Sequence, residues 1–346
     1  MANKTARLGD LATYINGYAF KPADWGETGL PIIRIQDLTG NSYQLNRYDG
    51  EYPERIEVND GDVLISWSAS LGVYVWQRGK ALLNQHIFKV VFDKLPVNKD
   101  YFVFAVEHKL AEMESKTHGA TMKHIVKKDF DGTTIPYPPI EKQAEIADHL
   151  RRITSLIDGQ TEQLLLLDQL VKSRFIELFG DPETNPKGWT RQRLDQICEN
   201  LDSRRVPITS TNRKAGNYPY YGASGIVDYV KDYIFDEDIL LISEDGANLV
   251  MRSTPIAFSV SGKVWVNNHA HVVRFESKAT QKYIEICFAL TDISGSITGT
   301  AQPKLNQAKL NAMMFCVPPI ELQEQFATFV EQTDKSKLCS KMEVAA

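Results

Sequence analysis

The longest regular pattern of apolar side chains lies in the middle of the chain. From residue 140 to residue 179 there is no proline and a single glycine, Gly159. Apolar residues recur there at the a and d positions of a heptad repeat, interrupted by Gln160 and Arg174. Pro138-Pro139 precedes the pattern and Gly180-Asp181-Pro182 follows it, which fits the two ends of a helix. The pattern predicts a helix of about 40 residues, roughly 60 Å long, that needs a partner helix to cover its stripe.

Both flanking segments have the pattern of short strands. Runs of apolar, β-branched or aromatic residues are separated by Gly, Asn and Asp, the usual punctuation of strands and turns. The clearest runs are Pro31–Ile35, Val63–Trp67, Val73–Trp76, Ile87–Phe92, Ile239–Ile242 and His271–Phe275. Helices are also predicted at Tyr101–Ser115 and Gln281–Thr291. Each flanking segment is therefore expected to be a mixed, strand-rich domain.

The two flanking segments repeat each other. Short matches occur in the same order at offsets between 176 and 186 residues. They pair Leu8–Leu11 with Leu194–Ile197, Asp62–Ser66 with Asp238–Ile242, Asn84–His86 with Asn267–His269, Ile125 with Leu305, Phe130 with Leu310, and Tyr137–Gln143 with Val317–Gln323. The repeat predicts two diverged copies of one module, each a globular unit followed by a helix. The second helix starts at Ile320 and has weaker later heptads, with Lys337 where Ile157 stands in the first.

Composition limits how this chain could contact nucleic acid. Hydrophobic residues make up 43% and charged residues 24%, as in a folded globular protein. The net charge of −5 means that any contact with nucleic acid must use local basic patches. The four cysteines form no CxxC pair, which argues against a zinc ribbon and a disulfide framework. Without an apolar leader or a run of about 18 apolar residues, we expect a soluble cytoplasmic protein that does not contact a membrane.

Several motifs together resemble one family. They are Asn16-Gly17 with Phe20-Lys21, Trp25 and Leu30–Leu38; Gly61–Ser66 with Leu83–His86; the two Pro-Pro-Ile-Glu-x-Gln sequences; and Phe179–Pro182 with Asn185–Trp189. The chain is similar over nearly its whole length to the specificity (S) subunit of a type I restriction-modification system. The resemblance implies an α/β (α+β) fold, in which long coiled-coil helices separate two similar target recognition domains. The implied parts are domain 1 at residues 1–139, a central conserved spacer helix at 140–180, domain 2 at 181–319, and a short conserved helix at 320–346.

The resemblance also implies a function. Each domain would read one half of an asymmetric, bipartite site in double-stranded DNA. The chain would direct two copies of the methyltransferase (M) subunit, together with restriction (R) subunits, to that site. The chain itself would be no enzyme and would hold no cofactor, because S-adenosylmethionine, ATP and Mg belong to the partner subunits.

The implied antiparallel pairing of the two helices leaves part of the central stripe uncovered. A second helix that ends near Met342 would cover the Gly159–Phe179 end. Ile146, Leu150 and Ile153 would then lack a partner within the chain, and we expect them to bind a methyltransferase subunit. A second copy of this chain, or the first domain folding back, are the alternatives.

Motifs for catalysis and metal binding are missing. A methyltransferase acting on the adenine amino group needs a glycine-rich cofactor loop and an Asn/Asp-Pro-Pro-aromatic tetrad, but both Pro-Pro pairs here are followed by isoleucine. A P-loop is absent too. His269 and His271 lie two apart on a predicted strand, without a nearby cysteine or acid to complete a zinc site. A core or DNA-facing role is therefore favoured over a metal site for both histidines.

Two basic segments are candidate contacts to DNA phosphates, where each cation releases counterions. Residues 203–214 contain no acid and hold Arg204, Arg205, Arg213 and Lys214. Residues 119–128 also contain no acid and hold Lys123, His124, Lys127 and Lys128. The second segment has a counterpart at residues 299–308, with Lys304. A solvated loop face is the alternative for each segment.

Base contacts need side chains that match base edges, such as Arg or Lys for guanine and Asn or Gln for adenine. The candidates are Arg34, Gln36, Asn84, Gln85, His86, Asn268, His269 and Gln302, with Lys304 beside the last. Tyr220 and Tyr221 could pack on a sugar or base. For Asn267-Asn268, capping of a turn is the alternative.

Two other functions remain open from the residues. One is the recognition portion of a fused restriction-methylation enzyme. The other is a coiled-coil scaffold that carries β-rich modules for binding a sugar or a peptide.

Overall fold

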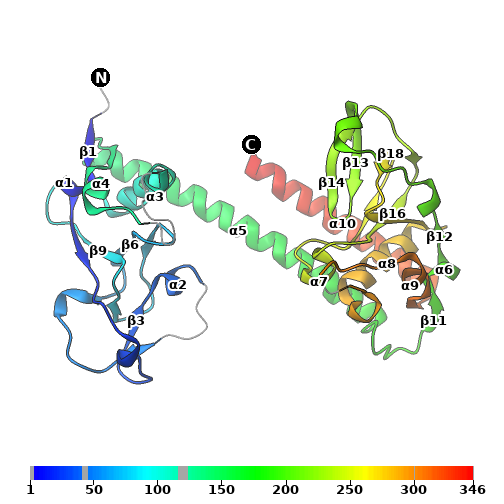
Figure 1. The fold of residues 1–346 in the computed structure, drawn as a ribbon, viewed down its shortest axis with the longest axis horizontal. Helices are drawn as coiled ribbons and strands as arrows, with labels where there is room; N and C mark the ends of the chain where they lie inside the picture. Colours follow the sequence, from blue (N-terminus) through cyan, green and yellow to red (C-terminus); the bar gives the residue numbers. More distant parts are fainter. Residues whose placement is uncertain (1–3, 41–45, 116–123, 300, 346) are drawn as a thin grey trace. The chain divides into compact units, whose positions relative to one another are not determined.

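The computed structural model describes residues 4–40, 46–115, 124–299 and 301–345, without the side chains of residues 341–345. The chain forms two units, Met1–Leu156 and Ile157–Ala346 (Figure 1). The boundary falls inside the helix α5 (Ile140–Phe179), which both units share. Its bounds agree with the 40-residue helix that the heptad pattern predicts.

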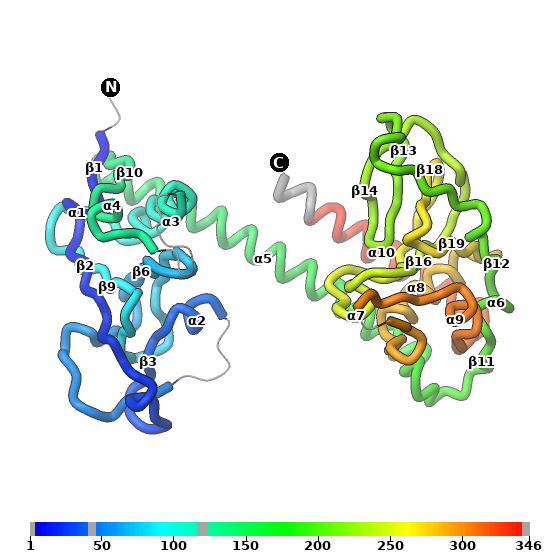
Figure 2. Tube along the Cα trace, in the orientation of Figure 1, coloured from blue at the N-terminus to red at the C-terminus, as the bar shows by residue number. Residues whose placement is uncertain are grey.

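Unit 1 contains two four-stranded sheets and a pair of strands that joins its two ends (Figure 2). The first sheet has the order β2-β9-β6-β7 and is antiparallel throughout. The second has the order β4-β3-β8-β5, with β3 and β8 parallel. The joining pair is β1 with β10. The bounds are β1 Thr5–Arg7, β2 Thr13–Asn16, β3 Leu30–Ile33, β4 Arg47–Tyr48, β5 Glu57–Val58, β6 Val63–Ser66, β7 Gly72–Val75, β8 Ala81–Leu83, β9 Ile87–Val91 and β10 Thr134–Pro136.

Helices complete unit 1, and its core has two parts. The helices are α1 (Leu8–Leu11), α2 (Ile35–Leu38), α3 (Lys99–Ser115) and α4 (Lys127–Gly132). Strand β6 separates the two core clusters: Val63 and Ile65 belong to one, and Leu64 belongs to the other. Successive side chains of a strand point to opposite faces, so a strand that is packed on both faces is apolar throughout.

Unit 2 repeats this topology. Its sheets have the orders β12-β19-β16-β17 and β14-β13-β18-β15, and β11 pairs with β20. Subtracting ten from each strand number gives the strand orders of unit 1. The strands are β11 Thr190–Arg193, β12 Glu199–Asn200, β13 Ala215–Gly222, β14 Gly225–Val230, β15 Phe235–Asp236, β16 Ile239–Ser243, β17 Ala257–Val260, β18 Lys263–Val266, β19 Ala270–Arg274 and β20 Met314–Val317. The helices are α6 Leu194–Ile197, α7 Asn248–Met251, α8 Lys278–Leu290, α9 Gln307–Ala312 and α10 Ile320–Ala345.

The structure confirms the predicted repeat and the mixed, strand-rich fold. All six predicted runs contain strands, and the two predicted helices correspond to α3 and α8. One detail of the repeat is wrong by a residue. Ser66 pairs with Ile87 and Ser243 pairs with Ala270, so Ser66 corresponds to Ser243 at an offset of 177, not to Ile242. Because a shift of one residue exchanges the two faces of a strand, the corrected offset is the one that matches inward-facing residues.

The two long helices pack together inside unit 2. Phe326 of α10 contacts Phe175 and Phe179 of α5, with ring centroids 5.5 Å and 5.4 Å away. Farther along α10, the Lys337 ammonium lies 2.7 Å from the Asp168 carboxylate of α5. Residue numbers rise along α10 while they fall along α5, so the pairing is antiparallel, as expected. The ion pair explains the weak late heptads of α10: a lysine replaces the apolar residue where the facing helix offers an acid.

A candidate nucleic-acid interface

In unit 1, three segments that are far apart in the sequence meet at the end of β6. The backbone N–H of Trp67 donates to the carbonyl of His86 at 3.1 Å, and the carbonyl of Trp67 accepts from the N–H of Ile125 at 3.1 Å. Ser68 forms an antiparallel bridge with His124. The Trp67 ring also lies 4.9 Å from the His86 ring. We call Trp67, Ser68, His86 and His124 the first-unit cluster.

Unit 2 forms the same arrangement at the end of β16. The N–H of Glu244 donates to the carbonyl of His269 at 2.9 Å, and its carbonyl accepts from the N–H of Leu305 at 2.8 Å. Asp245 forms an antiparallel bridge with Lys304. We call Glu244, Asp245, His269 and Lys304 the second-unit cluster. The structure thus brings predicted site residues together in each unit: His86 with His124, and His269 with Lys304.

The side chains that hold the two clusters differ in kind. In unit 1, Trp67 stacks on Phe88 with centroids 5.7 Å apart, and its indole N–H donates to Asn16 at 3.2 Å. The sheet registers place Glu244, His271 and Asp202 of unit 2 at the positions of these three residues. The two stacked aromatic residues and the asparagine of unit 1 are therefore replaced in unit 2 by three ionisable residues.

The ionisable groups of unit 2 form a connected network. His271 Nδ1 lies 2.6 Å from an Asp202 oxygen, and its Nε2 lies 2.7 Å from the Leu305 carbonyl oxygen. The Glu244 carboxylate lies 2.6 Å from the Arg205 guanidinium and 3.1 Å from the Lys304 ammonium. Arg205 also donates to the carbonyl of Ala270 at 2.7 Å. Buried charges require such partners, because burial without them costs several kcal/mol.

The network keeps both carboxylates ionised. Burial acts to raise the pKa of Glu244, but the hydrogen bond from Arg205 and the nearby His271 and Lys304 outweigh it, so the pKa is lowered. Burial likewise opposes ionisation of Asp202, and the hydrogen bond and charge of His271 reverse the effect and lower the pKa of Asp202. Glu244 and Asp202 therefore stay charged beside Arg205 and His271.

His86 has an unusual backbone conformation. Its φ is +73°, in the left-handed region that residues other than glycine rarely adopt. Its Nδ1 is buried and has no hydrogen-bond partner among the described atoms. Burial and the neighbouring His124 lower the pKa of His86, which favours the neutral ring. Strain together with an unused polar atom is common at functional sites.

The other base-reading candidates of unit 1 lie next to its cluster. The N–H of Asn84 donates to Ile33 at 3.2 Å, which places Asn84 and Gln85 beside Arg34, the residue after β3. The Arg34 guanidinium lies over the Trp25 ring at 5.6 Å, and Gln36 is exposed on α2. Gly17 permits this close packing, since a Cβ there would lie 2.0 Å from the Asn84 carbonyl oxygen.

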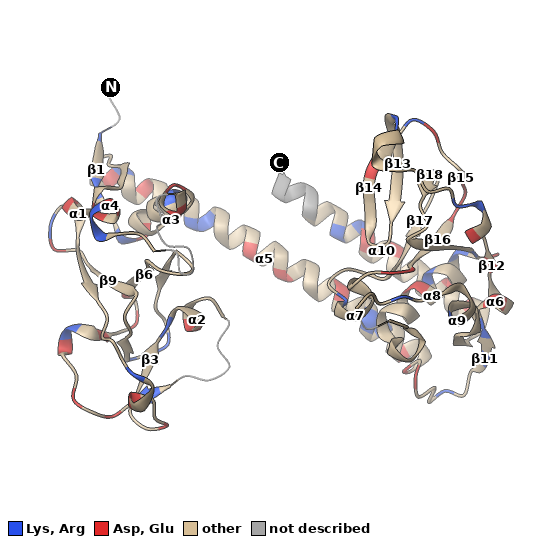
Figure 3. Ribbon diagram, in the orientation of Figure 1, with Lys and Arg blue, Asp and Glu red and all other residues tan. Residues whose placement is uncertain are grey.

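In the second unit's basic segment, several side chains already have partners. Arg204 lies 2.7 Å from Glu237, and Arg213 lies 3.2 Å from Asp228 and 4.4 Å from the centroid of the Tyr220 ring. Arg205 belongs to the buried network. In Figure 3, basic and acidic residues are interspersed in unit 2. Lys214 is exposed.

The aromatic and amide candidates of unit 2 differ in exposure. Tyr220 is buried, and the N–H of Ile208 donates to its hydroxyl oxygen at 3.0 Å, so its ring cannot stack on a base in this conformation. Tyr221 is half-buried and packs against the core. Asn267 is buried and its side chain accepts from the N–H of His269, which is the turn-capping alternative. Asn268 and Gln302 are exposed.

Of the lysines in the first unit's basic segment, Lys123 lies outside the described residues. Lys127 lies 2.9 Å from Asp131 and also 5.4 Å from the centroid of the Tyr14 ring. Lys128 is exposed. Both lysines are exposed, but Lys127 is held in an ion pair, so Lys128 is the better candidate for a phosphate contact in the described part of this segment.

Sequence reasoning missed Trp67, Ser68, Glu244 and Asp245. The signal was present in the repeat, because the two segments that follow β6 and β16 are equivalent. The one-residue error in that match concealed that Trp67 corresponds to Glu244. These two residues, which we call the hub residues because each pairs with two other loops, also have unrelated side chains.

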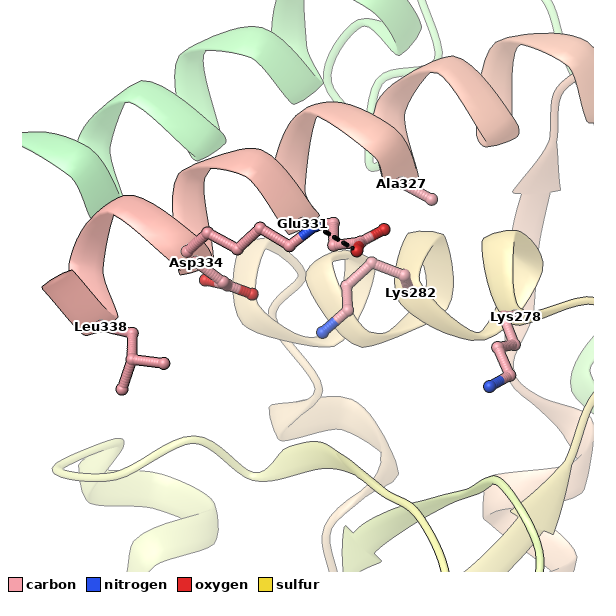
Figure 4. Close-up of a pocket in the computed structure, with 7 residues that line it drawn as sticks. Lys278, Lys282, Ala327, Glu331, Asp334 and Leu338 are labelled. Atoms are coloured by element: carbon pink, nitrogen blue, oxygen red, sulfur yellow. Dashed lines mark ion pairs between the residues drawn. The ribbon is translucent and has the colours of Figure 1, made fainter.

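Two cavities of unit 2 lie away from the second-unit cluster. Figure 4 shows a groove of about 390 Å³ between α8 and α10, where Lys335 lies 2.8 Å from Glu331. A larger cavity of about 730 Å³ is lined by residues of α5, α7, α8 and α10. Neither is lined by a residue of the second-unit cluster. Among the described residues, no group of His, Cys, Asp or Glu could hold a metal ion, and no helix is long and apolar enough to span a membrane.

Comparison with known proteins identifies the family. The family model of the type I restriction modification DNA specificity domain matches residues 2–166 and 186–342. The MjaVIII specificity subunit of Methanocaldococcus jannaschii is 23% identical over 96% of this chain and 86% of its own length. The EcoBI specificity subunit of Escherichia coli is 29% identical over 48% of this chain. That match spans 35% of the E. coli subunit, and a Haemophilus influenzae relative is matched over the same share of its length.

A solved structure supports the fold. The S subunit of a type I restriction-modification system from M. genitalium superposes with a TM-score of 0.64, covering 99% of this chain and 92% of that chain at 15% identity. Identity this low supports the fold alone. With the family model matching both units, the chain belongs to the family of type I restriction modification DNA specificity domains.

Proposed function

We propose that this chain is the sequence-specific DNA-binding subunit of a type I restriction-modification complex, and that each unit reads one half of an asymmetric, bipartite DNA site. One observation carries the proposal. The same loop arrangement occurs in both units with different side chains: Ser68, His86 and His124 in one, and Asp245, His269 and Lys304 in the other.

These side chains suit contacts to base edges. A serine hydroxyl and a histidine ring can each donate or accept a hydrogen bond, and a lysine can donate to guanine, whereas an aspartate accepts from cytosine. His269 and Lys304 are about half exposed, so DNA can reach them. Since the two sets differ, they match different base sequences, which gives an asymmetric site.

The partners and cofactors are part of the proposal. We propose that methyltransferase subunits, in two copies, and restriction subunits assemble with this chain on double-stranded DNA in the cytoplasm. The chain itself performs no chemistry, and S-adenosylmethionine, ATP and Mg are bound by its partners.

Methylome sequencing tests the central claim. Cells that carry the gene together with its methyltransferase gene should show one bipartite methylated motif with unlike halves, and that motif should vanish when this gene is deleted. In vitro, the chain alone with S-adenosylmethionine and DNA should transfer no methyl group. A motif that survives deletion, or methyl transfer by the chain alone, would contradict the proposal.

We further propose that the exposed stripe of α5 binds a methyltransferase subunit. Ile153 is 52% exposed, while Ile146 and Leu150 are half-buried. Aliphatic side chains that are exposed or partly exposed in a row favour a protein partner, because covering a fully exposed one contributes roughly 1.5–3 kcal/mol and covering a half-buried one contributes less. Changing Leu150 and Ile153 to Asp should abolish co-purification with the methyltransferase subunit while the chain stays folded.

The same helix offers a matched control. Leu165 and Leu166 are exposed by 60% and 55% but lie off the heptad stripe. Changing these two residues to Asp should leave co-purification intact. If both pairs of substitutions abolish it, or if the Leu150 and Ile153 changes unfold the chain, the stripe is not a specific docking surface.

A further inference from the structure

Glu244 connects three separate loops of unit 2. Its carboxylate lies 2.6 Å from Arg205 and 3.1 Å from Lys304, while its backbone pairs with His269 and Leu305. Its side chain is only 12% exposed. We infer that Glu244 is a positioning residue for reading the second half-site: its buried carboxylate fixes where the Lys304 cation lies relative to His269.

Comparison of the two units separates the role of this side chain from that of its backbone. Trp67 occupies the same position in unit 1 and makes the same two backbone hydrogen bonds. The loop arrangement therefore forms without a carboxylate at the hub. In unit 2 the carboxylate adds ion pairs with two cations. They are Arg205, in the segment after β12, and Lys304, in the loop before α9.

The two cations differ in their exposure, and this difference gives Glu244 its effect. The Arg205 side chain is 13% exposed and also donates to a backbone carbonyl, so it serves as a fixed support. The Lys304 side chain is 51% exposed and can reach a ligand. A free lysine is a mobile point charge that pairs with any phosphate. The ion pair with Glu244 restricts Lys304 to one position and makes it less free to pair with phosphates.

This inference rests on the proposed function and makes a counter-intuitive prediction. Glu244→Gln keeps the size of the side chain but removes the charge that holds Lys304. Binding of the full chain to duplexes of unrelated sequence should then become tighter, with the salt dependence steeper by about one unit, since one more cation pairs with phosphate. Discrimination against mismatches in the second half-site should fall by about tenfold, within the usual range for one base pair. Discrimination in the first half-site should not change.

The assay uses the full chain in complex with its methyltransferase subunit. The probes are duplexes with the motif given by methylome sequencing, with either half scrambled, and one unrelated duplex. Glu237→Gln is the matched control. Glu237 also bridges two cations, lying 2.7 Å from Arg204 and 2.9 Å from Arg274, but it precedes β16 whereas Glu244 follows it. This control should leave both half-sites unaffected.

A second variant keeps the test decisive if Glu244→Gln unfolds the unit. Lys304→Gln should lose discrimination at the second half-site and leave the salt dependence unchanged, because Lys304 held by Glu244 pairs with no phosphate. The double variant should lose no more discrimination than Lys304→Gln alone, because the two residues act through one contact. Equal losses at both half-sites, or unchanged discrimination in the Lys304→Gln variant, would overturn the inference. If the unaltered complex shows no preference for either half, the proposed function fails instead.

Discussion

His86 combines a strained backbone with an unused ring nitrogen, and both observations point to recognition rather than packing. A left-handed φ at a non-glycine residue costs of order 1 kcal/mol. The cost is retained here although asparagine, which tolerates this conformation, could make the same turn. The ring rests on Trp67 and adds some stability, but its buried Nδ1 gains nothing from the described atoms.

Replacing His86 by Asn should therefore separate stability from recognition. The free energy of unfolding should change by less than about 1 kcal/mol, because relief of strain offsets the lost ring contact. Discrimination at the first half-site should fall, as measured by competition between matched and scrambled duplexes. Ala69→Gly is the control, since Ala69 also has a positive φ, of 56°, but carries no polar group. If His86→Asn unfolds unit 1, the residue is structural.

Asp202 should make the stability of the chain depend on pH. Its pKa in the folded state is lower than in the unfolded state, so the folded state binds fewer protons. Its contribution is complete above the ordinary Asp pKa, about 4, and is lost as the pH falls through the lower folded value. Asp202→Asn should destabilise the chain at pH 7, and the difference in melting temperature from the unaltered chain should shrink below about pH 4. A difference that does not change with pH would contradict this account.

Most charge partners of the second unit's basic segment could not be predicted from neighbouring residues. The segment around Arg204, Arg205 and Arg213 contains no acid, which suggested free cations. Asp202, just outside the segment, lies 3.4 Å from Arg205, but the other partners come from residues 15 to 39 positions away: Asp228, Glu237 and Glu244. Local composition carries no information about such contacts, because the sheet topology creates them.

At the scale of elements, periodicity was sufficient for most of the fold. The heptad pattern gave α5 with its observed bounds, and alternating apolar runs marked the strands of both central sheets. Short strands without a strong apolar pattern, such as β12 and β15, were not predicted. They are positioned by pairing with β19 and β18, so their formation depends on tertiary contacts.

The α5–α10 pairing should be a main source of stability in unit 2. Phe326 of α10 is fully buried in a cluster with Phe175 and Phe179 of α5 and Tyr283 of α8. The cluster therefore joins the helix pair to α8. Phe326→Ala should lower the free energy of unfolding by roughly 3–5 kcal/mol, because it leaves a cavity. Leu338→Ala on the same helix is the control: Leu338 is 59% exposed, so its loss should cost far less. Denaturant unfolding of both variants measures the difference, and equal effects would show that α10 is not anchored by this aromatic cluster.

At the scale of the whole molecule, each unit closes on itself. The strand pairs β1–β10 and β11–β20 join the beginning and end of each unit. Each could therefore be exchanged as a block without cutting a sheet, provided that the contacts of Tyr283 with Phe175 and Phe179 of α5 are kept.

Exchanging residues 190–317 for the second unit of another family member should change one half of the methylated motif and leave the other half unchanged. Exchange of both boundary strands together preserves the β11–β20 pair. Methylome sequencing of cells with the chimeric chain measures the outcome. The reciprocal exchange of residues 5–136 should change the other half. A motif altered in both halves by a single exchange would show that the units do not read independently.

The unlike hubs, Trp67 and Glu244, also give the chain a direction. A complex built from two identical modules would bind equally well after a half-turn about its symmetry axis, and it would treat the two DNA strands as equivalent. In this chain, exchanging the half-sites of the two units would bring Trp67 to the half-site that suits Glu244. Under the proposed function, each bound site would then have a defined polarity, and the two DNA strands would not be equivalent.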